Sequence, residues 1–241
     1  MNALTSLSRL GRRQPRLTFS PLTWLKLQFF CHHGDTEIAG FGTTADKDLL
    51  HVENFVTVRQ HTSPMTVALE DDAVADYMDR CVDASLPPQR CLRIWCHTHP
   101  GSSAEPSGTD EDTFARVFGS CDWAVMFIMS RTGSTFARLS FHVGPRASFD
   151  LPVSVDWSAW PTVLADPAPP LEKLISEWRD EFRANIHRVP DLLLASAVMQ
   201  NDTGALGRPW EPFAPGWDWT DLDQELREDY ERYARLFDGD T

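Results

Sequence analysis

The chain has 241 residues, a hydrophobic fraction of 42% and a formal net charge of −13. These values fit a soluble globular protein with one sizeable domain and an extension, or with two small domains. The acidic balance argues against a nucleic-acid partner, because phosphate binding needs clustered Lys and Arg. No segment approaches the roughly 18 apolar residues that span a bilayer, so no membrane partner is expected.

The N-terminal stretch is basic. Four arginines lie between residues 9 and 16, and no acidic side chain precedes Asp35. Such a stretch can resemble an organelle transit peptide, but it lacks the apolar core of a secretory signal. We interpret residues 1–20 as a flexible leader and infer no targeting from it.

Helices and strands are predicted in mixed order after the leader. Leu22, Leu25 and Phe29 suit one face of a first helix. β-Branched and aromatic residues indicate strands, and acids at 71 and 72 suit the first turn of a second helix. In chain order we expect a helix over 21–31, strands over 36–43, 49–60 and 65–70, a helix over 71–82 and a buried strand over 91–97.

A polar loop, a helix and a hairpin complete this region. Phe114, Val117 and Phe118 share one face of the predicted helix, and a Thr-Gly turn favours a hairpin after it. We expect a helix over 110–118 and strands over 123–130 and 135–143. This mixture predicts an α+β fold in a three-layer, α/β/α-like arrangement, with helices flanking one mixed sheet.

The character of the chain changes after residue 156, where prolines mark a boundary. An apolar stripe predicts a helix over 171–186. Further helices are expected over 191–199 and from Thr220, with an irregular stretch over 203–216. We therefore divide the chain into a leader (1–20), a central α+β domain (21–156) and a mostly helical extension (157–241). The extension is rich in tryptophan, and we expect these side chains to pack it onto the domain, with a partner surface as the alternative.

The five cysteines indicate a compartment. They are Cys31, Cys81, Cys91, Cys96 and Cys121. Their number is odd and no Cys-x-x-Cys pair occurs, so a disulfide framework is not expected and a cytoplasmic location is predicted. Most of them are expected to be small buried hydrophobes.

A short polar motif carries the chemistry. Two residues apart on a strand, His97 and His99 point to the same side, and Asp110 begins the next helix. Two imidazoles and a carboxylate can hold one Zn²⁺ and leave a fourth position for a catalytic water, whose pKa the metal lowers. The spacing therefore predicts a metal-dependent hydrolase. Ser107 and Asp110 also match a helix capping box, which is the structural alternative for that pair.

Hydrolysis also needs a base that is not a metal ligand, to take a proton and pass it to the leaving amine. The candidates are Glu37, Glu53, Glu70 and Glu105. Chemistry alone does not choose among these four carboxylates.

The run His97-Thr98-His99-Pro100, followed by Ser107 and Asp110, resembles the JAMM motif of the MPN metalloprotease family. The resemblance covers about residues 20–150 and includes the order of the predicted elements. It selects Glu37, because the stretch 37–42 looks like the Glu-x-x-Gly-x-x strand of that family. It implies an MPN/JAMM fold with a mixed, curved sheet, zinc bound by His97, His99 and Asp110, Glu37 as the group that orients and deprotonates the water, and Ser107 as a donor to the developing oxyanion.

The same resemblance implies a zinc isopeptidase that cleaves after the C-terminal Gly of a ubiquitin-like protein, in deconjugation or in precursor maturation. The chain looks most similar to bacterial members linked to ubiquitin-like conjugation systems. Its expected partners are a ubiquitin-like protein or its conjugates, and activating or conjugating enzymes of the same pathway. Two alternatives stay open: hydrolysis of a sulfur-carrier-protein conjugate or a short peptide, and a non-catalytic MPN scaffold, against which the retained ligands argue.

Overall fold

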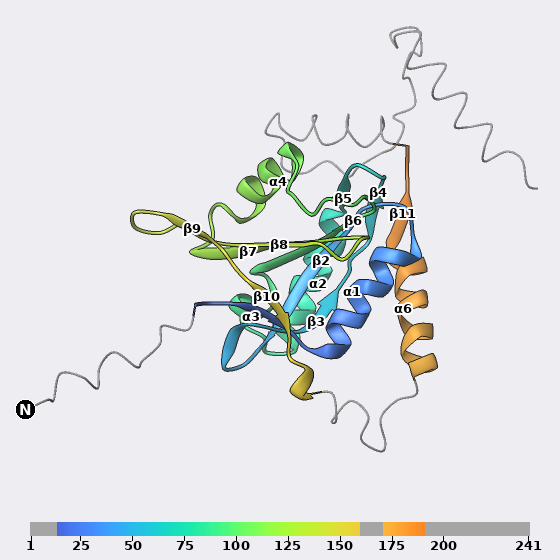
Figure 1. The fold of residues 1–241 in the computed structure, drawn as a ribbon, viewed down its shortest axis with the longest axis horizontal. Helices are drawn as coiled ribbons and strands as arrows, with labels where there is room; N and C mark the ends of the chain where they lie inside the picture. The colour runs from blue at the N-terminus through green and yellow to red at the C-terminus, as the bar shows by residue number, and fades with distance from the viewer. Residues whose placement is uncertain (1–13, 160–170, 191–241) are drawn as a thin grey trace, which may run out of the picture.

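The computed structural model describes residues 14–159 and 171–190, and it is a mixed α+β structure (Figure 1). Its helices are α1 (Pro21–His33), α2 (Asp71–Asp83), α3 (Pro88–Cys91), α4 (Gly108–Phe118) and α6 (Leu171–Asn185), with a 3-10 turn at Trp157–Ala159. Its strands are β1 (Leu17–Phe19), β2 (Ile38–Ala45), β3 (Asp48–Val56), β4 (Gln60–Thr62), β5 (Val67–Leu69), β6 (Ile94–His99), β7 (Trp123–Ser130), β8 (Thr135–Phe141), β9 (Ala147–Asp150), β10 (Val153–Val155) and β11 (Ile186–Arg188).

Eight strands form one curled mixed sheet in the order β10-β1-β3-β2-β6-β7-β8-β9. The two outer strands, β9 and β10, follow each other in the chain and are separated only by Leu151 and Pro152. The N–H of Leu151 donates to the carbonyl of Ala137 on β8, and the N–H of Leu17 on β1 donates to the carbonyl of Pro152. This short connection therefore ties both edges of the sheet together, which accounts for the curl. A separate sheet has the order β11-β4-β5.

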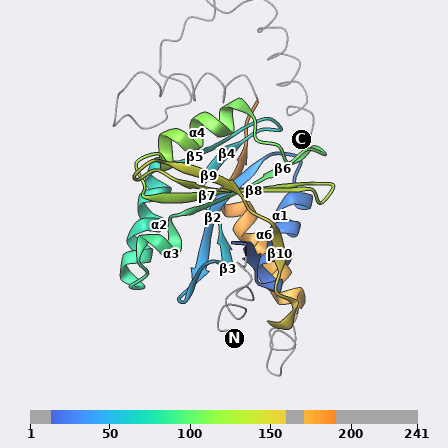
Figure 2. The same ribbon diagram turned by 60° about the vertical axis from the view of Figure 1, so that its left-hand side comes forward.

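Helices cover both faces of the large sheet, as Figure 2 shows. On one face α1 and α6 pack over a core that includes Phe30, Phe55 and Phe127. On the other face α2 and α4 pack over a second core that includes Tyr77 and Phe114. Because both faces are covered, all six residues of β6 are buried, and β7 is apolar along most of its length rather than alternating. The predicted layering of helices around one mixed sheet is confirmed.

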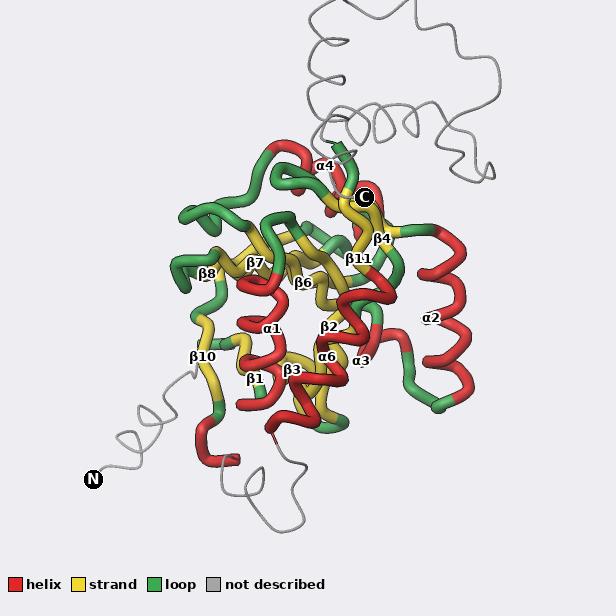
Figure 3. The backbone as a smooth tube through the Cα atoms, turned by 90° about the vertical axis from the view of Figure 1, so that its right-hand side faces the viewer, coloured by secondary structure: helices red, strands yellow, loops and turns green. Residues whose placement is uncertain are grey.

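The first helix buries side chains on more than the one face that its apolar spacing indicates. Leu22, Leu25 and Phe29 are half-buried, and the buried residues of α1 are Pro21, Thr23, Lys26, Leu27, Phe30 and Cys31. The reason is that α1 and α6 lie side by side on this face of the sheet (Figure 3), so α1 carries apolar side chains both toward the sheet and toward α6. Phe29 faces α6, with its ring centroid 5.8 Å from that of Trp178.

The structure differs from the expected domain division at the end of the leader, and from the expected extension at the end of its first helix. Residues 17–19 fall in the expected leader, yet they form β1 inside the large sheet, where Leu17 and Phe19 are fully buried. In the expected extension, α6 agrees with the predicted helix over 171–186 except that Ile186 begins β11. Trp178 is buried against the first core, so this part of the extension packs onto the domain. The elements expected over 191–199, over 203–216 and from Thr220 lie outside the described residues.

Two further expectations concern membranes and cysteines. Within residues 14–159 and 171–190, no helix has the length and apolar content needed to cross a bilayer. All five cysteines are free thiols; four are buried and Cys121 is partly exposed. The expectation that most cysteines act as small buried hydrophobes is confirmed.

Candidate metal centre

The two histidines lie at the end of β6, in the middle of the sheet. All six residues of β6 are buried, because β2 pairs with it on one side and β7 on the other. His97 and His99 are two residues apart, so both imidazoles project to the same face of the strand. His97 is completely buried and His99 is 9% exposed. A short strand with two neighbours thus brings two nitrogen ligands together without a special backbone conformation.

The carboxylate comes from the first turn of α4. Ser107 caps this helix: its Oγ accepts a hydrogen bond from the N–H of Asp110, and Asp110 Oδ2 accepts from the N–H of Ser107 at 2.7 Å. The capping box is therefore real, and it leaves Asp110 buried and turned to the ends of the histidine side chains. The structural interpretation of this pair is confirmed, and it leaves Asp110 Oδ1 directed to His97, where it could also serve as a metal ligand.

The three candidate ligands form a compact triangle. The Nε2 atoms of His97 and His99 lie 3.2 Å apart. Asp110 Oδ1 is 3.2 Å from Nε2 of His97, and Oδ2 is 3.5 Å from Nε2 of His99. Ligands of a tetrahedral zinc ion, with bonds of 2.0–2.2 Å, are separated by about 3.3 Å. These three side chains are close enough to hold one metal ion, and within the described residues they are the one His, Cys, Asp and Glu group so arranged.

The orientation of each imidazole has a different cause. His99 Nδ1 lies 3.0 Å from the carbonyl of Ser103, to which it donates as an N–H, so in the neutral ring the lone pair is on Nε2. His97 Nδ1 is buried and makes no hydrogen bond among the described residues. Its ring is held instead by Trp95, whose ring stacks on it with centroids 4.4 Å apart. His97 is therefore oriented by aromatic packing and His99 by a backbone hydrogen bond.

Burial and mutual hydrogen bonds shift the pKa values of all three candidate ligands. Burial lowers the pKa of His97, against the opposing effect of its hydrogen bond to Asp110. Burial also acts on His99, but the hydrogen bond to Asp110 and the charge of Glu37 outweigh it and raise the pKa of His99. Burial works against the Asp110 carboxylate, yet hydrogen bonds from both histidines hold its pKa well below the usual range. The site thus favours an ionised Asp110 carboxylate, and a metal ion bound there would take the place of the proton that the raised pKa of His99 retains between His99 and Asp110.

Of the four candidate bases, Glu37 lies beside the ligands. Its Oε1 is 3.7 Å from Nε2 of His99, and the residue is 7% exposed. It directly precedes β2, whose antiparallel pairing joins Ile38 to Thr98 and so places Glu37 opposite His99. Its backbone is held as well, because its N–H donates to the carbonyl of Ser63.

The other three carboxylates have different surroundings. Glu53 faces Arg90 at 4.0 Å and is largely exposed. Glu70 pairs with Arg59 and with His61. Glu105 is exposed in the loop before α4. The geometry therefore singles out Glu37 as the carboxylate nearest to the three candidate ligands.

Ser107 is fully engaged in the structure. Its hydroxyl donates to Asp110 Oδ2 at 2.7 Å and accepts from the N–H of Asp110. A hydroxyl has one proton, so this arrangement directs it to the carboxylate. The role of Ser107 as an oxyanion donor stays a prediction.

Sequence reasoning missed the residues that support the site. Besides Trp95 and Ser103, Gln60 is fully buried and accepts from the N–H of Ala39, while its side-chain amide donates to the carbonyls of Ala39 and Val58. Gln60 thereby satisfies the backbone of β2 where β3 no longer pairs with it, two residues from Glu37. In the sequence Gln60 stands among other polar residues, between Arg59 and His61, and such a stretch is too common to be informative.

Neither a protein-family model nor a curated protein sequence matches this chain.

Proposed function

We propose that this chain is a zinc-dependent peptidase with a JAMM-type centre in an MPN-like fold. The observation that carries the proposal is the triangle of His97, His99 and Asp110 with the Glu37 carboxylate beside it. Three ligands leave one position of a tetrahedral zinc ion open, as in catalytic rather than structural sites. The curled mixed sheet flanked by helices is the kind of fold that the motif implies.

The chain's own residues have separable roles in this proposal. His97, His99 and Asp110 would hold the ion, which when bound would polarise the scissile carbonyl and lower the pKa of the attacking water. Glu37 would accept one proton from that water and return it to the leaving amine as the C–N bond breaks. Water is thus divided between the two products: the hydroxyl joins the carbonyl carbon and the proton joins the amine.

Ser107 has two proposed roles: it orients the Asp110 ligand, and it donates a hydrogen bond to the oxyanion. Its present bond to Asp110 Oδ2 stabilises the helix start and orients the ligand. To donate to an oxyanion, the hydroxyl would have to rotate away from Oδ2, which would still accept from the Ser107 N–H at 2.7 Å. Because that backbone bond remains, the rotation leaves the carboxylate partly satisfied. Both roles are therefore compatible with one hydroxyl group at different steps.

The substrate class that we propose is a peptide or isopeptide bond after the C-terminal Gly of a ubiquitin-like protein. The support is the motif around His97, His99 and Asp110. The same centre could serve the trimming of a sulfur-carrier-protein conjugate or of a short peptide. A scaffold role without catalysis is disfavoured by the retention of three ligand side chains together with Glu37.

A substrate panel tests the proposal. The full-length, zinc-loaded protein is incubated with linear ubiquitin-like fusions, isopeptide-linked conjugates, sulfur-carrier conjugates and short peptides, and the products are identified by mass spectrometry. Cleavage after the terminal Gly that stops on chelation and returns with zinc is the expected result. Cleavage of the carrier conjugates or short peptides alone would favour the second substrate class. No cleavage of any of them by zinc-loaded protein would contradict the peptidase proposal and favour a scaffold.

A further inference from the structure

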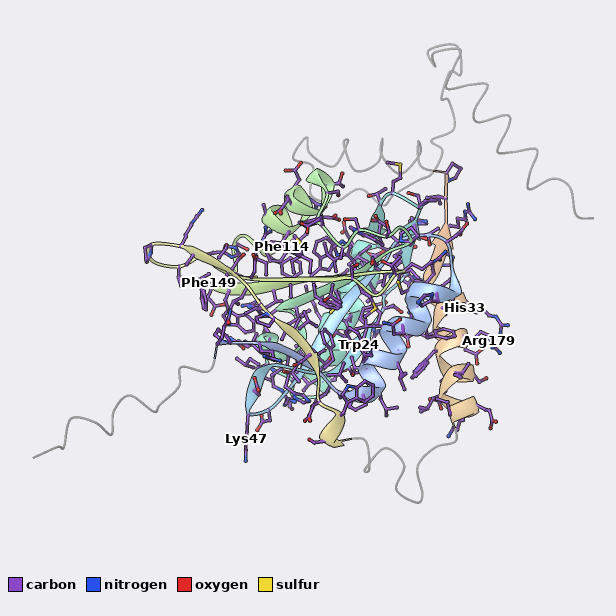
Figure 4. The ribbon with its side chains drawn as sticks, in the orientation of Figure 1. Trp24, His33, Lys47, Phe114, Phe149 and Arg179 are labelled. Carbon is purple, nitrogen blue, oxygen red and sulfur yellow. The ribbon has the colours of Figure 1, made fainter. Side chains whose placement is uncertain are left out.

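The helix that carries Asp110 is attached to the sheet by a narrow contact. Asp110, Phe114 and Phe118 are its buried residues, spaced four apart along one stripe. The residues between them are exposed or only half-buried. Phe114 lies between α4 and the sheet (Figure 4). Such a stripe resists lifting of the helix, but by itself it resists rolling and sliding poorly.

An ion pair lies directly beside Asp110, the candidate metal ligand on α4. Arg138 on β8 donates from Nη1 and Nη2 to the two carboxylate oxygens of Glu111, at 2.8 and 2.5 Å. Glu111 follows Asp110 in the first turn of α4. A two-point guanidinium–carboxylate contact fixes orientation as well as distance. The pair therefore restrains the first turn of α4 against rolling and sliding over the sheet, the two motions that the apolar stripe resists poorly.

The guanidinium is itself held in place. Its carbon lies 5.9 Å from the ring centre of Phe114 and 5.7 Å from that of Phe136, so it is placed over two aromatic faces. Its Nε is buried and makes no hydrogen bond within the described part of the chain. The contacts to Glu111 and to the two rings are thus what position it.

The same arginine is connected to the histidine side of the site. Arg138 pairs with Met126 on β7, and Met126 pairs with Trp95 on β6. Phe114, beneath the guanidinium, lies 6.3 Å from the Trp95 ring, which in turn stacks on His97. One row across the sheet therefore links Arg138 to the aromatic packing that orients His97.

From these contacts we infer that Arg138 and Glu111 are positioning residues, which hold Asp110 at its ligand distance from His97 and His99. The inference rests on the proposed metal site. It assigns to the pair a contribution to metal affinity and geometry that exceeds its contribution to stability. Both side chains are partly exposed, 21% for Arg138 and 42% for Glu111, so the pair adds little to stability as an exposed ion pair.

The experiment compares zinc affinity in two matched pairs of residues. The test variants are Arg138→Met, Glu111→Gln and the double variant. The control is Arg93→Met with Asp122→Asn, since that pair has similar exposure, 16% and 49%, and lies at the opposite end of β6. Zinc dissociation constants come from chelator competition, coordination from the visible spectrum of the cobalt-substituted protein, and stability from thermal unfolding of the metal-free protein.

We expect Arg138→Met and the double variant to bind zinc about 10–100-fold more weakly, as for other residues that orient metal ligands. Their cobalt spectra should change while their unfolding midpoints stay near those of the control. The double variant should be no weaker than Arg138→Met, because the two residues act as one unit. The control should bind zinc within about twofold of the unaltered protein, since it restrains no ligand.

Equal zinc affinity in Arg138→Met and the unaltered protein would overturn the inference, and so would an equal loss in the control. Absence of zinc binding by the unaltered chain would overturn the metal site and this inference together. Zinc binding without cleavage of any substrate would overturn the proposed reaction alone.

Discussion

The side chains of Glu37 and His99 meet across the paired strands β2 and β6, with Glu37 Oε1 3.7 Å from His99 Nε2. This contact puts a buried carboxylate beside the candidate metal ligands His97, His99 and Asp110, but Glu37 is not part of that group. A carboxylate so placed can exchange a proton with a water in the open coordination position.

Replacing this carboxylate separates proton transfer from metal binding. Glu37→Gln keeps the shape of the side chain but removes its basicity, so peptide hydrolysis should fall by at least about 10²-fold. The zinc content should be unchanged, because His97, His99 and Asp110 remain. Cleavage rates and bound zinc are measured on the same preparation. A variant that cleaves at the original rate would rule out Glu37 as the base.

A largely buried ion pair joins α6 to α1, beside the apolar contacts that α6 makes through Trp178. Lys26 Nζ on α1 lies 2.6 Å from Glu181 Oε2, and Glu181 Oε1 accepts from the N–H and hydroxyl of Thr57. Glu181→Ala leaves the Lys26 ammonium without a counter-charge and with only the Phe55 carbonyl as partner, and we expect a loss of about 3 kcal/mol in the free energy of unfolding.

The matched control for Glu181→Ala is in the same helix. Glu177 pairs with Lys173 at the surface, where both side chains are more than half exposed. Glu177→Ala should therefore change the free energy of unfolding by less than about 1 kcal/mol. Urea unfolding of the full-length chain measures both variants. Equal effects would show that the buried pair is not what holds α6.

Gly40 is required by a close backbone approach in β2. A Cβ at this position would lie 2.3 Å from the carbonyl oxygen of Val56, a backbone atom that cannot move without opening the β2–β3 pairing. We expect Gly40→Ala to lower the thermal unfolding midpoint by several degrees, for a loss of about 1–3 kcal/mol. Gly101→Ala, where a Cβ would contact nothing within 4 Å, should leave the midpoint unchanged. A Gly40→Ala protein as stable as its Gly101→Ala control would contradict the packing of these strands.

The cysteines should differ in their reaction with iodoacetamide. Burial raises the pKa of Cys31 to about 11 and that of Cys91 to about 12, so neither is a thiolate at pH 8. Because the thiolate is the reactive form, their labelling should be slow and should rise with pH, while the partly exposed Cys121 is labelled first. Peptide mass spectrometry follows each site. Rapid labelling of Cys31 at pH 8 in the folded protein would contradict its burial.

The parts of the site that sequence could predict are those set by local spacing. The two-residue period of a strand places His97 beside His99, and the Ser107 cap places Asp110 in the first turn of α4. The contact to Glu37 could not be derived this way, because it depends on the pairing of β2 with β6, which only the fold decides. The family resemblance, and not the spacing, pointed to this residue.

The same distinction explains the errors in the predicted fold. The strand at Leu17–Phe19 has three residues and no periodicity to read, and it is formed by pairing with β3 and β10. The additional buried side of α1 could not be predicted from its own pattern, because it depends on α6, which is distant in the chain and packs beside it. Long, strongly apolar elements such as β7 were predicted with their observed bounds. Pairing and packing between distant segments are what a local pattern cannot contain.

Metal analysis of the purified full-length protein tests the central claim most directly. After incubation with zinc and removal of the unbound metal, we expect about one zinc ion per chain, and its loss in His97→Ala and in Asp110→Ala. A folded protein that retains no zinc, or that retains the same amount in both variants, would contradict the account.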